Sequence, residues 1–196
     1  MDFQTPSRGF LVGDRLFSHG LWSGLYRGFA MRAQLQGNET VLEVGCGTGP
    51  LSKHIARILR VGGHLICVDT SEAMLGMARR NLAAFDNVDL RYSELRQAGV
   101  EDASCDAVFA HFMLHELPAA DRPDFVRCLS EKLKPGGRLL IREPIGEDHG
   151  MPLDEIRGLL TQAGLSEAQG FAGRLLLVMP YYEGLWSAVP REDADV

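Results

Sequence analysis

Three glycines alternate with other residues in the segment Gly45-Cys46-Gly47-Thr48-Gly49, which directly follows a short apolar run. Glycines at alternate positions let the backbone turn sharply and approach a ligand without a clash from Cβ. Asp69 ends a second apolar run further along the chain. A carboxylate at that point of a dinucleotide site accepts hydrogen bonds from ribose hydroxyls. Together these residues predict a site for a ligand that contains a ribose.

The residues beside the glycine turn indicate which kind of ribose-bearing ligand would bind. The spacing is GxGxG followed by Pro50, which differs from the GxGxxG that places a helix N-terminus against a pyrophosphate. Glu43 precedes the first glycine by two residues, where it would repel a pyrophosphate but suits a cation. No GK[ST] triplet follows, which argues against a nucleoside triphosphate. The sequence therefore favours a cationic, phosphate-free cofactor and disfavours a nicotinamide-dependent oxidoreductase, which remains an alternative.

Strand-like and helix-like segments alternate after residue 40, and this alternation must position the turn. Short apolar runs predict strands over Val41–Val44, His64–Val68, Val88–Tyr92, Asp106–Ala110 and Arg138–Arg142. Helical patterns fall over Leu51–Leu59, Glu72–Phe85 (with Ser71 as its N-cap), Arg122–Leu133 and Leu153–Ala163. Such alternation predicts an α/β, Rossmann-like, doubly wound and mostly parallel sheet.

The end of the chain predicts an antiparallel addition to this sheet. Gln169–Phe171 and Leu175–Pro180 are strand-like and flank Ala172-Gly173, a hairpin signal. We expect the hairpin to complete a seven-stranded sheet with one antiparallel strand at its edge.

An aromatic helix is expected before the sheet, over Leu16–Ala33. Its interior glycines would weaken it by about 1 kcal/mol each, so it could be a mobile lid over a cofactor. The alternative, that it only covers the sheet, stays open. The expected organisation is a lid segment at 1–37, a catalytic domain at 38–190 and a flexible tail at 191–196.

Composition excludes several other classes of protein. The chain has 196 residues and a formal net charge of −6, which argues against nucleic-acid binding because phosphates require a basic face. Its four cysteines form no CxxC pair, so we expect reduced thiols, no metal site and a cytoplasmic protein. No apolar stretch reaches the length of a membrane span, and the N-terminus lacks the pattern of a signal peptide.

Four motifs together resemble the class I S-adenosylmethionine-dependent methyltransferases. They are VLEVGCGTG (41–49), CVDTSEAML (67–75), CDAVFAHFMLHELP (105–118) and LKPGGRLLI (133–141). Their order and spacing over residues about 38–180 are most similar to the small-molecule branch that includes the quinone-biosynthesis methyltransferases. The resemblance implies transfer of a methyl group from S-adenosylmethionine to a small, partly apolar acceptor.

The resemblance also implies which residues hold the cofactor. The turn residues Gly45, Cys46, Gly47 and Gly49 would wrap its methionine part, while Glu43 would hold the turn and, through water, the cofactor ammonium. Asp69 would bind the ribose hydroxyls. The remaining cofactor-binding residues implied by position are Thr70 and Met74 beside the ribose and adenine, Ser93, Glu94 and Leu95 at the adenine, and His111 at the methionine part. Glu94 stands where the family usually has an Asp.

Three histidines are candidates for a general base, which methyl transfer needs only when the acceptor must lose a proton. His111 follows the fourth predicted strand, His115 begins the helix expected after it, and His149 lies in the loop after the fifth strand. His111 could instead contact the cofactor through its backbone alone, and His115 could simply pack or cap a helix. The whole pattern is also compatible with a non-catalytic protein that binds the cofactor. The sequence does not specify the methyl acceptor. A homodimer is a further possibility.

Overall fold

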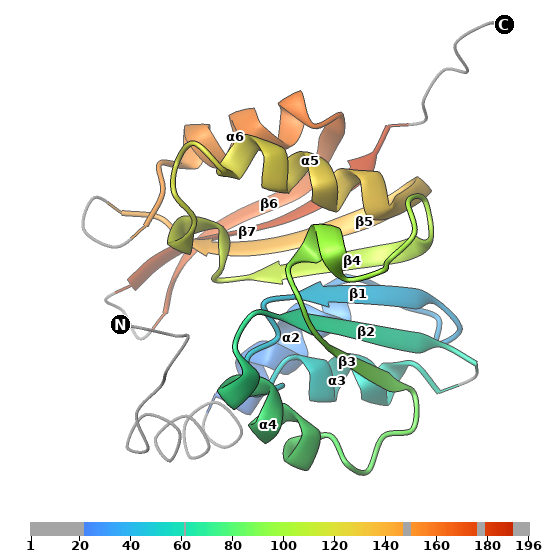
Figure 1. Ribbon diagram of the computed structural model, residues 1–196. Coiled ribbons are helices and arrows are strands. Elements are labelled where there is room, and N and C mark those ends of the chain that lie inside the picture. Colours follow the sequence, from blue (N-terminus) through green and yellow to red (C-terminus); the bar gives the residue numbers. More distant parts are fainter. Residues whose placement is uncertain (1–21, 61, 147–149, 176–178, 190–196) are drawn as a thin grey trace, which may run out of the picture. The chain divides into compact units, whose positions relative to one another are not determined.

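The computed structural model describes residues 22–60, 62–146, 150–175 and 179–189 (Figure 1). The chain divides into two compact units, residues 1–99 and 100–196. The strand order of its seven-stranded sheet is β3-β2-β1-β4-β5-β7-β6. The predicted fold class, an α/β protein with a mostly parallel sheet and an antiparallel C-terminal part, is confirmed.

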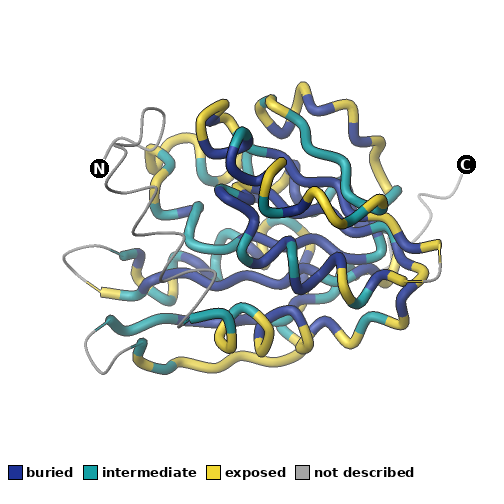
Figure 2. Tube along the Cα trace, turned by 90° about the horizontal axis from the view of Figure 1, so that it is seen from below, coloured by how far each residue is buried: buried dark blue, intermediate teal, exposed yellow. Residues whose placement is uncertain are grey.

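The first unit consists of three parallel strands and their connecting helices. Its elements are α2 (Ser23–Arg32), β1 (Thr40–Val44), α3 (Ser52–Ile58), β2 (His64–Asp69), α4 (Glu72–Asn81), β3 (Val88–Tyr92) and the 3-10 turn η2 (Leu95–Gln97). Strand β2 pairs with both neighbours, so that Glu43 lies beside Cys67 and Asp69 lies beside Tyr92. Because β1 and β2 are central strands, each contains four consecutive buried residues. Figure 2 draws the buried stretches of the described chain in dark blue.

The helices of the first unit follow the sequence pattern with one shortening. Ser71 caps α4 as predicted, because its hydroxyl accepts a hydrogen bond from the amide of Met74. The helix ends at Asn81 and not at Phe85, and Leu82 to Phe85 form a turn closed by the Phe85 amide on the Leu82 carbonyl. Helix α2 lies within the predicted aromatic helix and buries Phe29 and Ala30; the beginning of that prediction lies outside the described residues.

The second unit contains four strands covered by two helices. Its elements are β4 (Cys105–His111), η3 (Leu114–Glu116), α5 (Arg122–Lys132), β5 (Leu133–Pro144), α6 (Leu153–Gln162), β6 (Leu165–Leu175) and β7 (Met179–Ala188). Strands β4 and β5 are parallel, whereas β7 runs antiparallel to both β5 and β6. Helices α5 and α6 lie side by side and contact each other (Figure 1).

The position predicted for the C-terminal hairpin is wrong. Ala172 and Gly173 lie within β6, where Gly173 pairs with Tyr181, and β7 continues to Ala188. The antiparallel strand β7 lies between β5 and β6, so it is not an edge strand. An Ala-Gly pair permits a turn but does not require one, and here cross-strand pairing decides the backbone conformation.

Strand β5 also begins earlier than predicted. The stretch from Lys134 to Gly137, which precedes the predicted strand, belongs to β5, and Gly136 adopts a positive φ of 75° within it. A register shift between the pairs of Cys105 and Ala107 accommodates this irregular start. Helix α5 ends at Lys132, one residue before the predicted end at Leu133, because a proline followed by two glycines cannot continue a helix.

No helix in the described part of the chain is long and apolar enough to cross a membrane. The same residues contain no group of three or more His, Cys, Asp or Glu side chains arranged to hold a metal ion.

Candidate functional site

The glycine turn after β1 has the conformation that its sequence predicts. Gly45, Gly47 and Gly49 have φ values of 73°, 55° and 85°, in the left-handed region that favours glycine. The Gly45 amide donates a hydrogen bond to the carbonyl of Val68 (2.8 Å), which ties the start of the turn to β2. The glycines are therefore required by the backbone itself, whether or not a ligand is bound.

The second and third glycines of the turn have different surroundings. A Cβ on Gly49 would lie 2.9 Å from Cδ1 of Leu82, so this glycine allows the turn to pack closely against the end of α4. A Cβ on Gly47 would meet no atom within 4 Å. Gly47 therefore presents open backbone, which is the surface that a ligand can approach.

Asp69 lies at the carboxyl end of β2 and contacts this open part of the turn. Its Oδ2 accepts a hydrogen bond from the Gly47 amide (2.7 Å), and its Oδ1 accepts one from the Ser71 amide (2.8 Å). Burial raises the pKa of the Asp69 carboxyl, although hydrogen bonds from the amides of Gly47, Ser71 and Thr70 oppose the shift. The two residues that best predicted a ribose site are thus in direct contact.

Glu43 lies beneath the turn and is almost completely buried. Burial raises its pKa to about 8, while the neighbouring Ser52 hydroxyl and Cys67 thiol oppose that shift. The Cys67 thiol donates toward Glu43 Oε2 at 3.8 Å. Burial also raises the pKa of Cys67, and the pKa of Cys46 is raised chiefly by its hydrogen bond to Cys67. Glu43 is therefore protonated near neutral pH in the absence of a cation.

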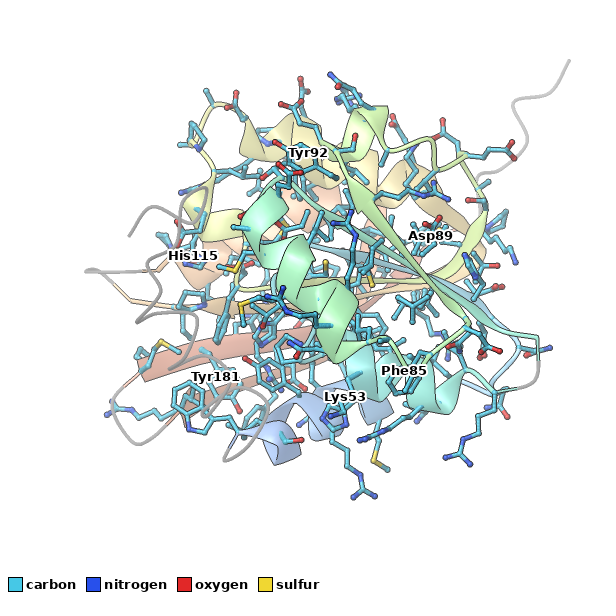
Figure 3. The ribbon with its side chains drawn as sticks, turned by 60° about the horizontal axis from the view of Figure 1, so that its bottom comes forward. Lys53, Phe85, Asp89, Tyr92, His115 and Tyr181 are labelled. Carbon is cyan, nitrogen blue, oxygen red and sulfur yellow. The ribbon has the colours of Figure 1, made fainter. Side chains whose placement is uncertain are left out.

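The residues expected around the ribose and adenine are only partly brought together. The Ser93 amide donates to the Asp69 carbonyl (3.1 Å), which places the end of β3 beside the end of β2. Thr70 and Glu94 are exposed, whereas the side chains of Met74 and Leu95 are buried. Figure 3 labels Tyr92, which precedes Ser93 and is 59% exposed.

In the second unit, His111 ends β4 and pairs with Arg142 of β5 in the sheet register. Its imidazole lies 4.3 Å from the ring of Phe112, measured between ring centroids. Burial and the charge of Arg142 lower the pKa of His111 to about 3. The imidazole is accordingly neutral at physiological pH and a weak base.

His115, labelled in Figure 3, lies in the 3-10 turn η3 and not at the start of the following helix as expected. Its Nδ1 lies 2.7 Å from Oε2 of Glu143, and its Nε2 lies 3.0 Å from Oε1 of Glu116. Burial lowers its pKa, but hydrogen bonds and charge from these two carboxylates outweigh burial, so the pKa is raised overall. The third candidate base, His149, lies outside the described residues.

Sequence reasoning missed Glu143 and Asn81. Glu143 ends an apolar strand just as Glu43 and Asp69 do, and this position was the available signal. The Asn81 amide donates to the carbonyl of Thr48 (2.9 Å), so the end of α4 holds the glycine turn from the other side. A polar residue at the end of a helix gives no sequence signal for such a contact.

Residues 41–137 match a family model described as a methyltransferase domain. Over 145 residues the chain is 30% identical to the ubiquinone/menaquinone biosynthesis C-methyltransferase UbiE of Escherichia coli K12. This alignment covers 72% of the chain and 57% of UbiE, so the chain spans little more than half the length of the curated relatives it matches.

Solved structures show the same fold. A SAM-dependent methyltransferase from Aquifex aeolicus superposes with a TM-score of 0.67 at 22% identity, covering 90% of this chain and 93% of that one. A 1,6-didemethyltoxoflavin-N1-methyltransferase from Burkholderia thailandensis, solved with bound 1,6-didemethyltoxoflavin and S-adenosylhomocysteine, gives a TM-score of 0.73 at 15% identity. That match covers 93% of this chain and 87% of the other.

The sequence match, the strand order and the glycine turn agree with one another. The chain carries a methyltransferase domain of the class I S-adenosylmethionine-dependent type, and the resemblance read from its four motifs is confirmed.

Proposed function

We propose that this chain transfers a methyl group from S-adenosylmethionine to a small, partly apolar acceptor. The observation that carries the proposal is the contact between Gly47 and Asp69, where an open glycine backbone adjoins a carboxylate. This arrangement suits a ribose-bearing ligand. The similarity to methyltransferases supports the same function.

The residues of the first unit fit such a donor. The space over Gly47 accommodates backbone contact with the methionine part, and Asp69 has acceptor capacity left for ribose hydroxyls because each carboxylate oxygen accepts more than one hydrogen bond. Thr70, Met74 and Ser93 to Leu95 would border the ribose and adenine. The buried carboxyl of Glu43 would hold the turn in place and, through water, bind the ammonium group of the cofactor.

S-adenosylmethionine supplies a methyl group on a sulfonium, whose leaving group is a neutral thioether. The chain's own contribution is to hold the acceptor in line with that methyl group and to exclude water. No nucleophile of the protein and no metal ion is required for this displacement.

The wider setting is also part of the proposal. We place the protein in the cytoplasm, since all four cysteines, Cys46, Cys67, Cys105 and Cys128, are free and buried. The segment at 1–37 would act as a lid, residues 38–190 would form the catalytic domain and residues 191–196 a tail. The partner would be a small molecule and not a nucleic acid, in line with the net charge of −6. A homodimer is compatible with this proposal.

Calorimetry with S-adenosylmethionine, S-adenosylhomocysteine and NAD tests the cofactor assignment. We expect binding of the first two in the micromolar range and none of NAD; binding of NAD alone would overturn the proposal. A thioether-release assay over hydroxyl, amine, carbon and thiol acceptors tests catalysis. Tight binding of S-adenosylmethionine without release of product from any acceptor would favour the non-catalytic alternative.

A further inference from the structure

The outer side of helix α2 combines exposed apolar and basic side chains. Leu25 and Met31 are 39% and 57% exposed, and Arg27 and Arg32 are exposed beside them. With about 3.6 residues per turn, these four positions fall within one half of the helix circumference, whereas the buried Ala30 falls in the other half. One side of α2 thus presents apolar groups flanked by positive charges.

Helix α3 extends this basic surface. It contacts α2, beside which it lies in Figure 1, and Oγ of Ser23 lies 3.0 Å from Nε2 of His54, which joins the two helices. Arg57 and Arg60 are exposed near the end of α3, and the half-buried Lys53 precedes Arg57 by one turn on the same side. Figure 3 shows Lys53 projecting from α3 close to α2. The basic residues of the two helices therefore belong to one surface of the first unit.

The sequences of α2 and α3 contain no acidic residue that could neutralise this surface. Between residues 22 and 60 the chain has five basic residues and two acidic ones, Glu39 and Glu43, and both carboxyl groups are buried. Exposed carboxylates in the described part of this unit, such as those of Glu72 and Asp86, belong to α4 and the loop after it. In the whole chain, acidic residues outnumber basic ones by 26 to 20. Positive charge is therefore concentrated on α2 and α3.

This combination of side chains fits an anionic lipid surface better than a nucleic acid. Basic side chains are attracted to anionic headgroups, while apolar side chains such as Leu25 and Met31 are stabilised by insertion below the headgroups. A nucleic acid would attract the same charges, but its bases stack on exposed aromatic rings. The aromatic side chains of α2 are turned inward, because Phe29 is buried and Tyr26 is half-buried. Its exposed aliphatic side chains would have no partner on a phosphate backbone.

We propose that the outer face of α2 and α3, formed by Leu25, Arg27, Met31, Arg32, Arg57 and Arg60, binds the surface of an anionic lipid bilayer. Helix α2 would lie along the headgroups, with its two exposed apolar side chains inserted and the arginines bound to lipid phosphates. Such binding is peripheral and reversible. It is independent of the proposed methyl transfer, which uses the glycine turn and Asp69.

Co-sedimentation with lipid vesicles tests the electrostatic part. The probes are vesicles of phosphatidylcholine alone and vesicles in which about one third of this lipid is replaced by phosphatidylglycerol. We expect the wild type to bind the anionic vesicles at least about 10-fold more tightly, and to lose most of this difference at about 0.5 M NaCl. Combined Arg27→Gln and Arg57→Gln should weaken binding to the anionic vesicles by at least about 10-fold.

The matched control removes the same charge elsewhere. Arg127→Gln combined with Arg174→Gln replaces two exposed arginines on α5 and β6, and it should weaken binding by less than about 2-fold. Urea unfolding checks that every variant is folded, and calorimetry with S-adenosylhomocysteine should give the wild-type affinity for each. Cofactor binding is thereby measured separately from lipid binding.

Two further substitutions test the apolar part in opposite directions. Met31→Ser should weaken binding to the anionic vesicles about 5-fold, whereas Val189→Ser, at a valine that is 53% exposed, should leave it unchanged. A Cβ on Gly28, which lies on the same side of α2, would meet no atom within 4 Å. Gly28→Leu therefore adds an apolar side chain without a clash, and it should tighten binding about 5-fold.

Equal affinity of the wild type for neutral and anionic vesicles, or no binding to either, would overturn the proposal. So would equal losses in the two double-arginine variants, because the total charge and not this face would then be responsible. Binding to a DNA or RNA duplex but not to the anionic vesicles would assign the face to nucleic acid instead. The proposed methyl transfer fails by a different result, since the wild type would then not bind S-adenosylmethionine or would release no thioether from any acceptor.

Discussion

The Asp69 carboxylate accepts a hydrogen bond from the amide of Gly47 at 2.7 Å, which joins the end of β2 to the turn after β1. The residue expected to bind the ribose thus also shapes the turn expected to hold the methionine part. Because the same carboxylate also accepts from the Ser71 amide, it is aligned by α4 at its N-cap. Cofactor affinity and the conformation of the turn should therefore respond to the same substitution.

Asp69→Asn should weaken binding of S-adenosylhomocysteine by at least about 10-fold, because the amide replaces one acceptor oxygen by a donor and leaves a ribose hydroxyl without its partner, at a cost of about 1–3 kcal/mol. Calorimetric titration measures this. Asp86→Asn, on the exposed surface, is the control and should bind like the wild type. Equal affinity for the Asp69 variant would show that the ribose assignment is wrong.

Gly47→Ala and Gly62→Ala form a matched pair that separates ligand contact from backbone strain. Both glycines have positive φ, 55° and 79°, and neither would place a Cβ within 4 Å of another atom. Each substitution should therefore cost about 1–2 kcal/mol of stability in urea unfolding. Only Gly47→Ala should also weaken the binding of S-adenosylhomocysteine, because the new methyl group would occupy the space over the turn. If both variants bind alike, the open backbone at Gly47 is not part of the site.

Glu43 should make the ligand-free protein less stable as the pH rises. Its pKa is raised from 4.5 to about 8 in the folded chain, so between these values the unfolded chain is ionised and binds fewer protons than the folded one. Stability then falls with increasing pH. Glu43→Gln removes this contribution. As the pH rises from about 5 to about 8, the free energy of unfolding of the variant should increase relative to that of the wild type by at least about 1 kcal/mol, measured by urea unfolding. Glu101→Gln should show no such gain, and a parallel pH dependence of Glu43→Gln and wild type would contradict the prediction.

The sequence predicts most of the fold because the elements repeat a simple hydrophobic pattern. Strands β1 and β2 are buried runs bounded by turn residues, and their ends place the turn and Asp69 correctly. The C-terminal strands were placed wrongly because β6 is largely exposed on both faces and carries no clear alternation. Its pairing with β7 is a long-range property that local turn signals do not report.

In the candidate site too, the sequence predicts the local features but not the long-range contacts. The turn from Gly45 to Gly49 is local, so its residue types reveal it. The contact of Glu143 with His115 joins residues 28 positions apart, and it depends on the parallel register of β4 and β5. A single sequence gives no measure of that register, and a lone Glu in a strand is as easily interpreted as an ion-pair partner. The protonated state of Glu43 likewise follows from burial, which spacing alone does not determine.

His111 provides the last prediction, because its environment should keep its imidazole neutral at physiological pH. Burial and Arg142 lower its pKa from 6.5 to about 3, so the unfolded chain binds a proton that the folded chain does not as the pH falls through 6.5. This residue's contribution to stability is therefore complete above about pH 7 and is lost toward pH 3. In an imidazole NMR titration, the His111 signal should stay unchanged between about pH 5 and pH 8, whereas the midpoint of His115 should lie above the ordinary value for an imidazole. The stability of His111→Gln should therefore decrease less than that of the wild type as the pH falls from about 7 toward 3. His64→Asn is the control. A His111 midpoint near 6.5 would mean that the imidazole is solvated and would contradict the prediction.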